Sequence, residues 1–161
     1  MATKTTVSIT DSTMAKLLKK LEDGDIDEVK KLLREKIEEG RAKRLASGKT
    51  ISVKLSLSDR ARKEGLEEET VEATPIGPFA IHSKGRGSWF VTHVKSGLAA
   101  ITCVSKRTTA ILWAHELTKL LPESQWDREE PLRGLDSDKL NELVEVTRKA
   151  RRGELPASKA A

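Results

Sequence analysis

The sequence lacks the residues and runs that would place it in several large protein classes. Among its 161 residues Cys103 is the only cysteine, so no disulfide can form within the chain, as is typical of a reducing intracellular compartment. No apolar run approaches the roughly 18 residues that a membrane-spanning helix needs. The N-terminus also lacks the apolar stretch of a signal peptide. We therefore expect a cytoplasmic protein with no membrane partner.

Aromatic residues are scarce, at 3% of the chain, whereas charged residues make up 34%. This composition predicts a modest core under a heavily charged surface, in one domain or two small ones. The formal net charge of +5 is a mild excess that favours anionic partners.

Recognisable catalytic motifs are missing as well. Glu116 is the only acid between residues 75 and 121, and we find no glycine-rich phosphate loop and no nucleophile–base pair. His82 and His93 fall short of the usual four-ligand zinc pattern. Cys103 lacks an activating base and is expected to be a small core residue. We therefore predict no enzyme activity, no cofactor and no metal site.

What the chain does have is a change of periodicity near Gly48. Before it, polar and apolar residues alternate over Thr5–Thr10, which predicts a strand, and apolar stripes then predict two helices. The first helix should be capped by Asp11 or Ser12, and the second should run from a cap at Asp25 to about Leu45.

After Gly48 the pattern predicts strands at Ile51–Leu57, Phe79–Ser83, Ser88–Lys95 and Leu98–Ser105. A helix should follow from Arg107 or Thr108 to Leu121. The predicted class is α+β: a strand and helical hairpin, a three-stranded antiparallel meander packed on one helix, and a C-terminal helix. The predicted parts are 1–48 (strand and hairpin), 49–74 (strand and acidic connector), 75–121 (basic βββα domain), 122–151 (linker and helix) and 152–161 (disordered tail).

Side-chain alternation divides the meander into two faces. A tight Ser96-Gly97 turn would pair Thr92 with Ile101, and the preceding loop would bring Ile81 near Phe90. The helix-bearing face would then hold Phe79, Ile81, Phe90, Val94, Ala99, Ile101 and Cys103. The opposite face would hold His82, Trp89, Val91, His93, Ala100 and Thr102.

The basic charge is concentrated in this block. Residues 75–121 hold six Lys or Arg against one acid, and the difference equals the +5 of the whole chain. Cations that position phosphates and rings that stack on bases are typical of nucleic-acid surfaces. The predicted binding residues are Lys84, Arg86, Trp89, His93, Lys95, Lys106, Arg107 and His82. This favours a small, non-enzymatic nucleic-acid-binding protein of phage or bacterial type, with DNA favoured over RNA.

Two stretches resemble known families. Residues 79–121, with WFVTHVKSG followed by TTAILWAHEL, resemble the arm-binding domain of phage integrases and the plant ethylene-response DNA-binding domain. That resemblance implies that an exposed sheet reads DNA. The stretch SKRTTAILWA is also similar to the double-stranded-RNA-binding domain.

The second stretch, residues 5–45, resembles ribbon-helix-helix proteins through TTVSIT, DSTMAKLLKKL and DIDEVKKLLREKI. The resemblance implies a homodimer in which Lys4, Thr6, Ser8 and Thr10 face a DNA groove.

Three alternatives stay open. The helical hairpin is an ordinary one with solvated charged faces, or the sheet is covered by another segment with Trp89 in a second core. The third alternative is a protein-interaction adaptor or structural subunit that docks on a protein partner through its amphipathic helices.

Overall fold

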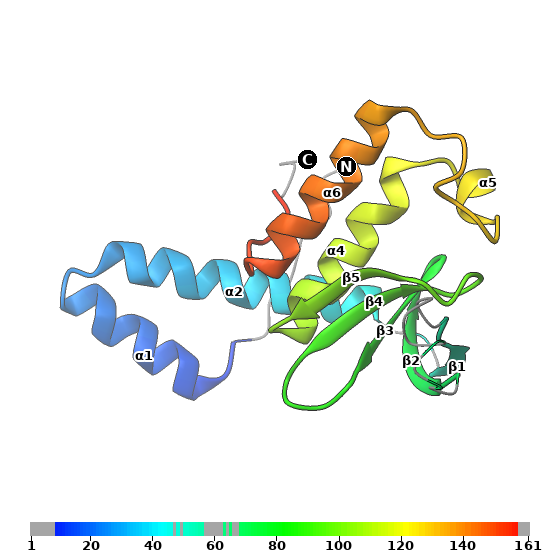
Figure 1. The fold of residues 1–161 in the computed structure, drawn as a ribbon. Coiled ribbons are helices and arrows are strands. Elements are labelled where there is room, and N and C mark those ends of the chain that lie inside the picture. The colour runs from blue at the N-terminus through cyan, green and yellow to red at the C-terminus, as the bar shows by residue number, and fades with distance from the viewer. Residues whose placement is uncertain are drawn as a thin grey trace. The chain divides into compact units, whose positions relative to one another are not determined.

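The computed structural model describes residues 9–46, 48, 50–56, 63, 65 and 68–157 (Figure 1). The chain divides into two compact units, Met1–Arg44 and Leu45–Ala161, which we describe separately. Helices and one antiparallel sheet make up the described part, which confirms the α+β class. Most of the predicted strand at Thr5–Thr10 lies outside the described residues.

The first unit is a helical hairpin made of α1 (Asp11–Glu22) and α2 (Ile26–Leu45), of which only Leu45 is assigned to the second unit. The cap of α1 is Thr10, one residue before the predicted position, and its hydroxyl accepts a hydrogen bond from the Thr13 backbone N–H at 3.4 Å. Asp25 lies at the start of α2 as predicted, and its carboxylate accepts from the Glu28 N–H at 3.3 Å.

The second unit contains a five-stranded antiparallel sheet in which neighbouring strands follow the chain order. Its strands are β1 (Ile51–Lys54), β2 (Thr70–Ile76), β3 (Phe79–Ser83), β4 (Trp89–His93) and β5 (Ala99–Val104). The three predicted meander strands are present, and β1 is shorter than predicted.

The strand β2 was not predicted, because the predicted division between parts 49–74 and 75–121 falls inside it, where Pro75, Gly77 and Pro78 are typical of a boundary. Instead Ile76 pairs directly with Phe79, so Gly77 and Pro78 form a two-residue hairpin turn. Gly77 has a φ of +56°, which suits the first central position of such a turn. The sheet therefore has two strands more than the predicted meander.

Three helices follow the sheet: α4 (Arg107–Leu120), the short α5 (Glu123–Trp126) and α6 (Ser137–Arg151). In Figure 1 α4 crosses the sheet and α6 lies beside α4, against β5. The Thr147 hydroxyl of α6 donates to the Ala100 carbonyl of β5 at 3.3 Å. The largest fully buried apolar side chains of the sheet are Val53, Phe79, Ile81, Val91, Ile101 and Val104.

The predicted division of the sheet into faces was wrong, because both hairpin registers differ from the predicted ones. Ile81 pairs with Val91 and not with Phe90, and a one-residue shift exchanges the two faces of a strand. Trp89, Val91 and His93 therefore share the face of Phe79 and Ile81. Phe90 and Thr92 lie on the opposite face with His82.

The β4–β5 connection is also longer than the predicted two-residue turn. Thr92 pairs with Ala99 and Val91 with Ile101, with register shifts along the ladder. One irregularity coincides with Cys103, which has a φ of +61° and is exposed. A β-bulge redirects side chains in this way, so the prediction of Cys103 as a core residue was also wrong.

The sheet bends so that the end of β1 meets the β4–β5 loop. The Ser56 N–H donates to the Gly97 carbonyl at 2.9 Å. Gly97 has a φ of +67°, and a Cβ there would collide with the Lys54 carbonyl oxygen. Beneath this bend lies a second apolar cluster, formed by Val53, Leu55, Ala73 and Ala80, with Ile51 and Val71 packed against it.

The segment predicted as a disordered tail makes contacts in its described part. The Trp113 indole N–H of α4 donates to the Glu154 carbonyl at 2.7 Å, and Pro156 is buried. Glu154 and Pro156 therefore contribute to the packing of the second unit.

Candidate nucleic-acid interface

The predicted binding residues do not lie on one sheet face. His82 is only 2% exposed and stacks on Phe90 with ring centres 5.5 Å apart. Its Nε2 lies 2.9 Å from the Thr92 hydroxyl. Burial, with a smaller effect of the nearby Lys84 cation, lowers the pKa of His82 from its ordinary value of 6.5. The ring is therefore a neutral packing group and cannot contact a phosphate.

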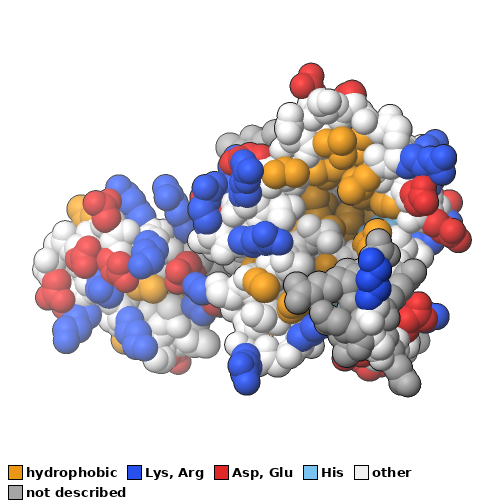
Figure 2. Space-filling model, in the orientation of Figure 1, with side chains coloured by type: hydrophobic (Ala, Val, Ile, Leu, Met, Phe, Trp, Pro, Cys, Tyr) orange, Lys and Arg blue, Asp and Glu red, His pale blue; other side chains and the backbone are white. Residues whose placement is uncertain are grey.

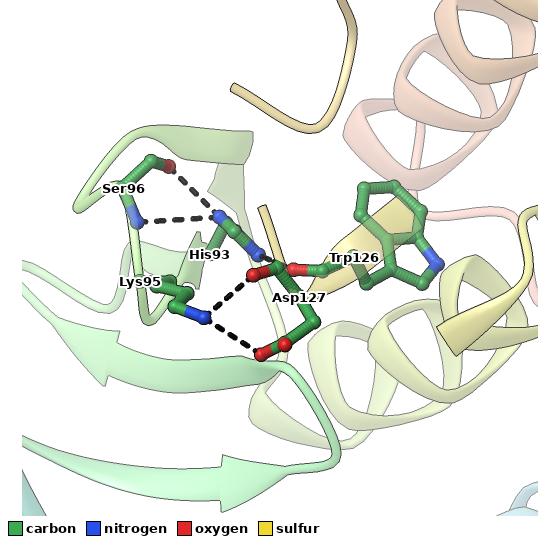
Figure 3. Close-up of polar contacts among 5 residues, drawn as sticks. All are labelled: His93, Lys95, Ser96, Trp126 and Asp127. Carbon is green, nitrogen blue, oxygen red and sulfur yellow. Dashed lines mark hydrogen bonds and ion pairs between the residues drawn. The ribbon is translucent and has the colours of Figure 1, made fainter. Parts of the chain in front are cut away.

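His93 is buried as well and ties β4 to the segment after α5 (Figure 3). Its Nε2–H donates to the Trp126 carbonyl at 2.7 Å, because a carbonyl oxygen can only accept. Its Nδ1 therefore accepts from the Ser96 N–H, at 3.3 Å. Both ring nitrogens are therefore hydrogen-bonded within the protein. His93, at the end of β4, has a structural role in holding the loop that leads to Leu98.

Lys95 lies next to this network and is held by Asp127 (Figure 3). Its ammonium group donates to the Asp127 backbone carbonyl at 2.6 Å and to the carboxylate at 2.8 Å. That side-chain hydrogen bond lowers the pKa of the Asp127 carboxyl from its ordinary 3.8. A cation already paired in this way is a weaker contact for a phosphate.

The remaining predicted residues gather at one end of the sheet. Ser83 pairs with Trp89, and Trp89 with Val104, so the β3–β4 loop and the β5–α4 connection lie at the same end. This group, called the basic end below, consists of Lys84, Arg86, Trp89, Lys106 and Arg107. Trp89 is half-buried, and the four cations are exposed.

Contacts inside the basic end fix some of these side chains. The Arg107 guanidinium carbon lies 5.7 Å from the centre of the Trp89 ring, and its Nη2 donates to the Thr74 hydroxyl at 3.0 Å. Lys84 lies 5.9 Å from the centre of the Phe90 ring and 3.5 Å from a Glu69 oxygen. Arg107 is therefore held by two neighbours in a position that still faces solvent.

The start of α4 adds backbone N–H groups to this end. The cap residue is Lys106, no side chain caps the helix, and its first turn has no acid. The positive end of a helix dipole is stabilised by anions and not by cations. Placing Lys106 and Arg107 there costs stability, and a bound phosphate would offset that cost.

Sequence reasoning did not single out Arg151, which lies beside the basic end. Its Nη2 donates to the Thr102 hydroxyl at 2.6 Å, and the side chain is exposed. The signal was present in the run Arg148–Arg152, which holds four cations in five positions. The sequence pattern places this run near the start of a disordered tail, whereas Arg151 lies on α6.

A second surface feature is an apolar groove of about 520 Å³ in the same unit. Figure 2 shows it as a hollow of hydrophobic side chains near the top of α4 and α6. Phe79, Leu117 and Trp126 line it, together with partly exposed residues from the β4–β5 loop, the α5–α6 loop and α6. These exposed residues are Leu98, Leu132, Leu140 and Val144, which are between 37% and 52% exposed.

Metal-binding clusters of three or more His, Cys, Asp or Glu do not occur among the described residues. Within the same part of the chain, no helix has the length and apolar character needed to cross a membrane. Comparisons of the chain with protein-family models, with curated proteins and with solved structures found no match.

Proposed function

We propose that the protein binds nucleic acid through the basic end of its sheet and not through a sheet face. The main support for this proposal is the start of α4. Two cations lie there, no side chain caps the helix, and the first turn has no acid. Such a terminus accepts phosphate through its N–H groups and its dipole. Lys84 and Arg86 on the β3–β4 loop extend this surface along a phosphate backbone.

The contacts in this proposal are electrostatic with one aromatic component. Phosphate contacts position a protein without reading sequence, so we expect little base preference. Trp89 is the aromatic member of the basic end, and its stacking on a base would favour single strands or unpaired ends. The acidic partner Glu69 of Lys84 would be displaced by phosphate on binding.

A salt titration tests the proposal. Fluorescence anisotropy should show binding to labelled single- and double-stranded DNA and RNA at about 50 mM salt, a condition in which even non-specific contacts persist. The logarithm of affinity should fall linearly with the logarithm of salt concentration. Absence of binding to all four probes would end the nucleic-acid proposal.

A second candidate function is favoured by the apolar groove. Soluble monomers rarely leave several large aliphatic side chains exposed around one hollow, and such patches usually mark a docking site. We propose that the occupant is an amphipathic helix of a partner protein, because apolar grooves between helices accept such helices through residues spaced three or four apart. This is the adaptor alternative, moved from the N-terminal helices to the groove.

The hydrophobic dye anilinonaphthalene sulfonate provides a probe for this groove. Its fluorescence should rise with the native protein and fall in Val144→Asp, whose side chain is 48% exposed and lies outside the buried core. Leu155→Asp is the matched control, because Leu155 is 41% exposed and lies outside the groove. Equal dye binding by the two variants would remove the groove as a docking site.

A further inference from the structure

Within the described residues, the helical hairpin of the first unit leaves one apolar face exposed. Its six large apolar side chains are between 36% and 55% exposed: Met14, Leu18, Leu21, Ile26, Leu33 and Ile37. On α1 they recur after four and three residues, and on α2 after seven and four. Each set therefore forms one stripe along its helix.

The two stripes lie on the same side of the hairpin. The buried residue Leu17 lies beside the stripe of α1, and the buried Val29 lies beside the stripe of α2. In each helix, the stripe is reached from the buried residue by turning about the helix axis in the direction in which the helix winds. The direction and the approximate angle of this turn are the same in α1 and α2. Because α2 runs back along α1 after the Asp23–Asp25 turn (Figure 1), equal offsets bring both stripes to one face.

Charged residues border this face with opposite signs. The outer border on α1 carries the acids Asp11 and Glu22. The outer border on α2 carries the cations Lys30, Arg34 and Arg41 and the acids Asp27 and Glu38. The Asp27 carboxylate lies 3.8 Å from the Lys30 ammonium, and the Glu38 carboxylate lies 3.6 Å from the Arg41 guanidinium. The border on α1 is therefore acidic, and the border on α2 carries a net positive charge.

We propose that this face binds a second copy of the chain, with the two-fold axis parallel to the helices. That axis places α1 of one protomer against α2 of its partner and forms an antiparallel four-helix bundle. The acidic border of each protomer then meets the basic border of the other. Glu22 and Lys30 both lie near the turn, and Asp11 lies at the open end towards Arg34, so these charges also match along the axis.

The other face-to-face arrangement, with the axis across the helices, is disfavoured by the same charges. It would place α1 on α1, with acids opposite acids, and α2 on α2, with cations opposite cations. Like charges across an interface cost binding energy and suppress wrong arrangements. Charge complementarity thus favours the arrangement with the axis parallel to the helices. It also favours a second copy of the chain as the partner that covers the apolar face.

Sedimentation equilibrium of the full chain tests the inference. The native protein should be a dimer at micromolar concentration, and Leu33→Asp should raise the dimer dissociation constant at least about a hundredfold, because a charge would enter an apolar interface. Leu33 is 36% exposed in the protomer, and unchanged circular dichroism would show that the variant still folds. A native protein that stays monomeric at about 100 μM overturns the inference.

Charge variants test the geometry without touching the apolar stripe. Lys30→Glu with Arg34→Glu should weaken the dimer, because both borders become acidic. Adding Asp11→Lys and Glu22→Lys to the same chain should restore the dimer, because the two borders have exchanged signs. Failure of the four substitutions to restore a dimer would overturn the proposed axis. Both outcomes are independent of nucleic-acid binding at the basic end.

Discussion

Arg107 lies over the indole ring of Trp89, with its guanidinium carbon 5.7 Å from the ring centre. The pair joins the first turn of α4 to β4 at the end of the sheet where the cations gather. A guanidinium above an aromatic ring can contact a phosphate while the ring meets a base, as in many single-strand binding sites.

Trp89→Ala should weaken single-strand binding by about 1–3 kcal/mol if the ring stacks on a base. Tryptophan fluorescence gives a direct measurement, because Trp113 and Trp126 are buried and Trp89 is not. Oligonucleotide should quench the native protein and leave the Trp89→Ala protein unquenched. Equal affinity and equal quenching in both proteins would exclude a stacking role.

Reversing the charges of Lys84 and Arg86 to Glu should weaken binding to all sequences alike. The salt slope should fall by about one unit for each phosphate that the variant no longer neutralises. Lys119→Glu serves as the control, since Lys119 lies in the last turn of α4, far along the helix from Arg107. A control that weakens binding as much as the loop reversals would indicate net charge alone and contradict a localised basic end.

The buried His82 makes stability depend on pH. Its pKa is lowered in the folded protein, so between this lowered pKa and the unfolded value of about 6.5 the unfolded chain binds more protons. Stability should therefore be full above about pH 6.5 and fall as the solution is acidified. Urea denaturation at a series of pH values should show a smaller decline for His82→Gln than for the native protein.

His115→Gln is the control for this pH series, because it removes an imidazole that is only partly buried, on α4. A native-like decline in His82→Gln would mean that other groups cause the pH dependence.

Gly97→Ala should destabilise the second unit by at least about 2 kcal/mol, because a methyl group would collide with backbone and the residue has a positive φ. Gly85→Ala is matched to it, with a φ of +83° and open space around the added carbon. The control should cost about 1 kcal/mol from its backbone conformation alone. Thermal unfolding compares the two, and equal losses would show that the approach of Lys54 to Gly97 is unimportant.

Local patterns predicted the helices and most strands well. The alternation of Phe79–Ser83 and the cap at Asp25 depend on neighbouring residues, and the structure agrees with both. Pairing register depends on turn length and bulges, which the sequence does not display. A difference of one residue in the β3–β4 register was enough to move Trp89 and His93 to the helix-bearing face.

The candidate site was predicted in part for the same reason. Lys106 and Arg107 could be read from the start of a helix, because helix boundaries are local. His93 was predicted to bind nucleic acid, but it is hydrogen-bonded to the Trp126 carbonyl, 33 residues away in the chain. Local patterns do not show a contact over that distance. Arg151 was missed because its partner Thr102 is 49 residues away.

The bend that joins Ser56 to Gly97 also limits how partners can be recognised. A sheet of this order has two edge strands, and unpaired edges are templates for strand addition by another chain. Here β5 is engaged at Ala100 by α6, and β1 is four residues long and leads directly into the bond with Gly97. In the described part of the sheet, the edge offered to an incoming strand is therefore short at β1 and interrupted at Ala100 on β5. We therefore expect partners to be recognised by side chains, at the basic end and in the groove, and not by main-chain pairing.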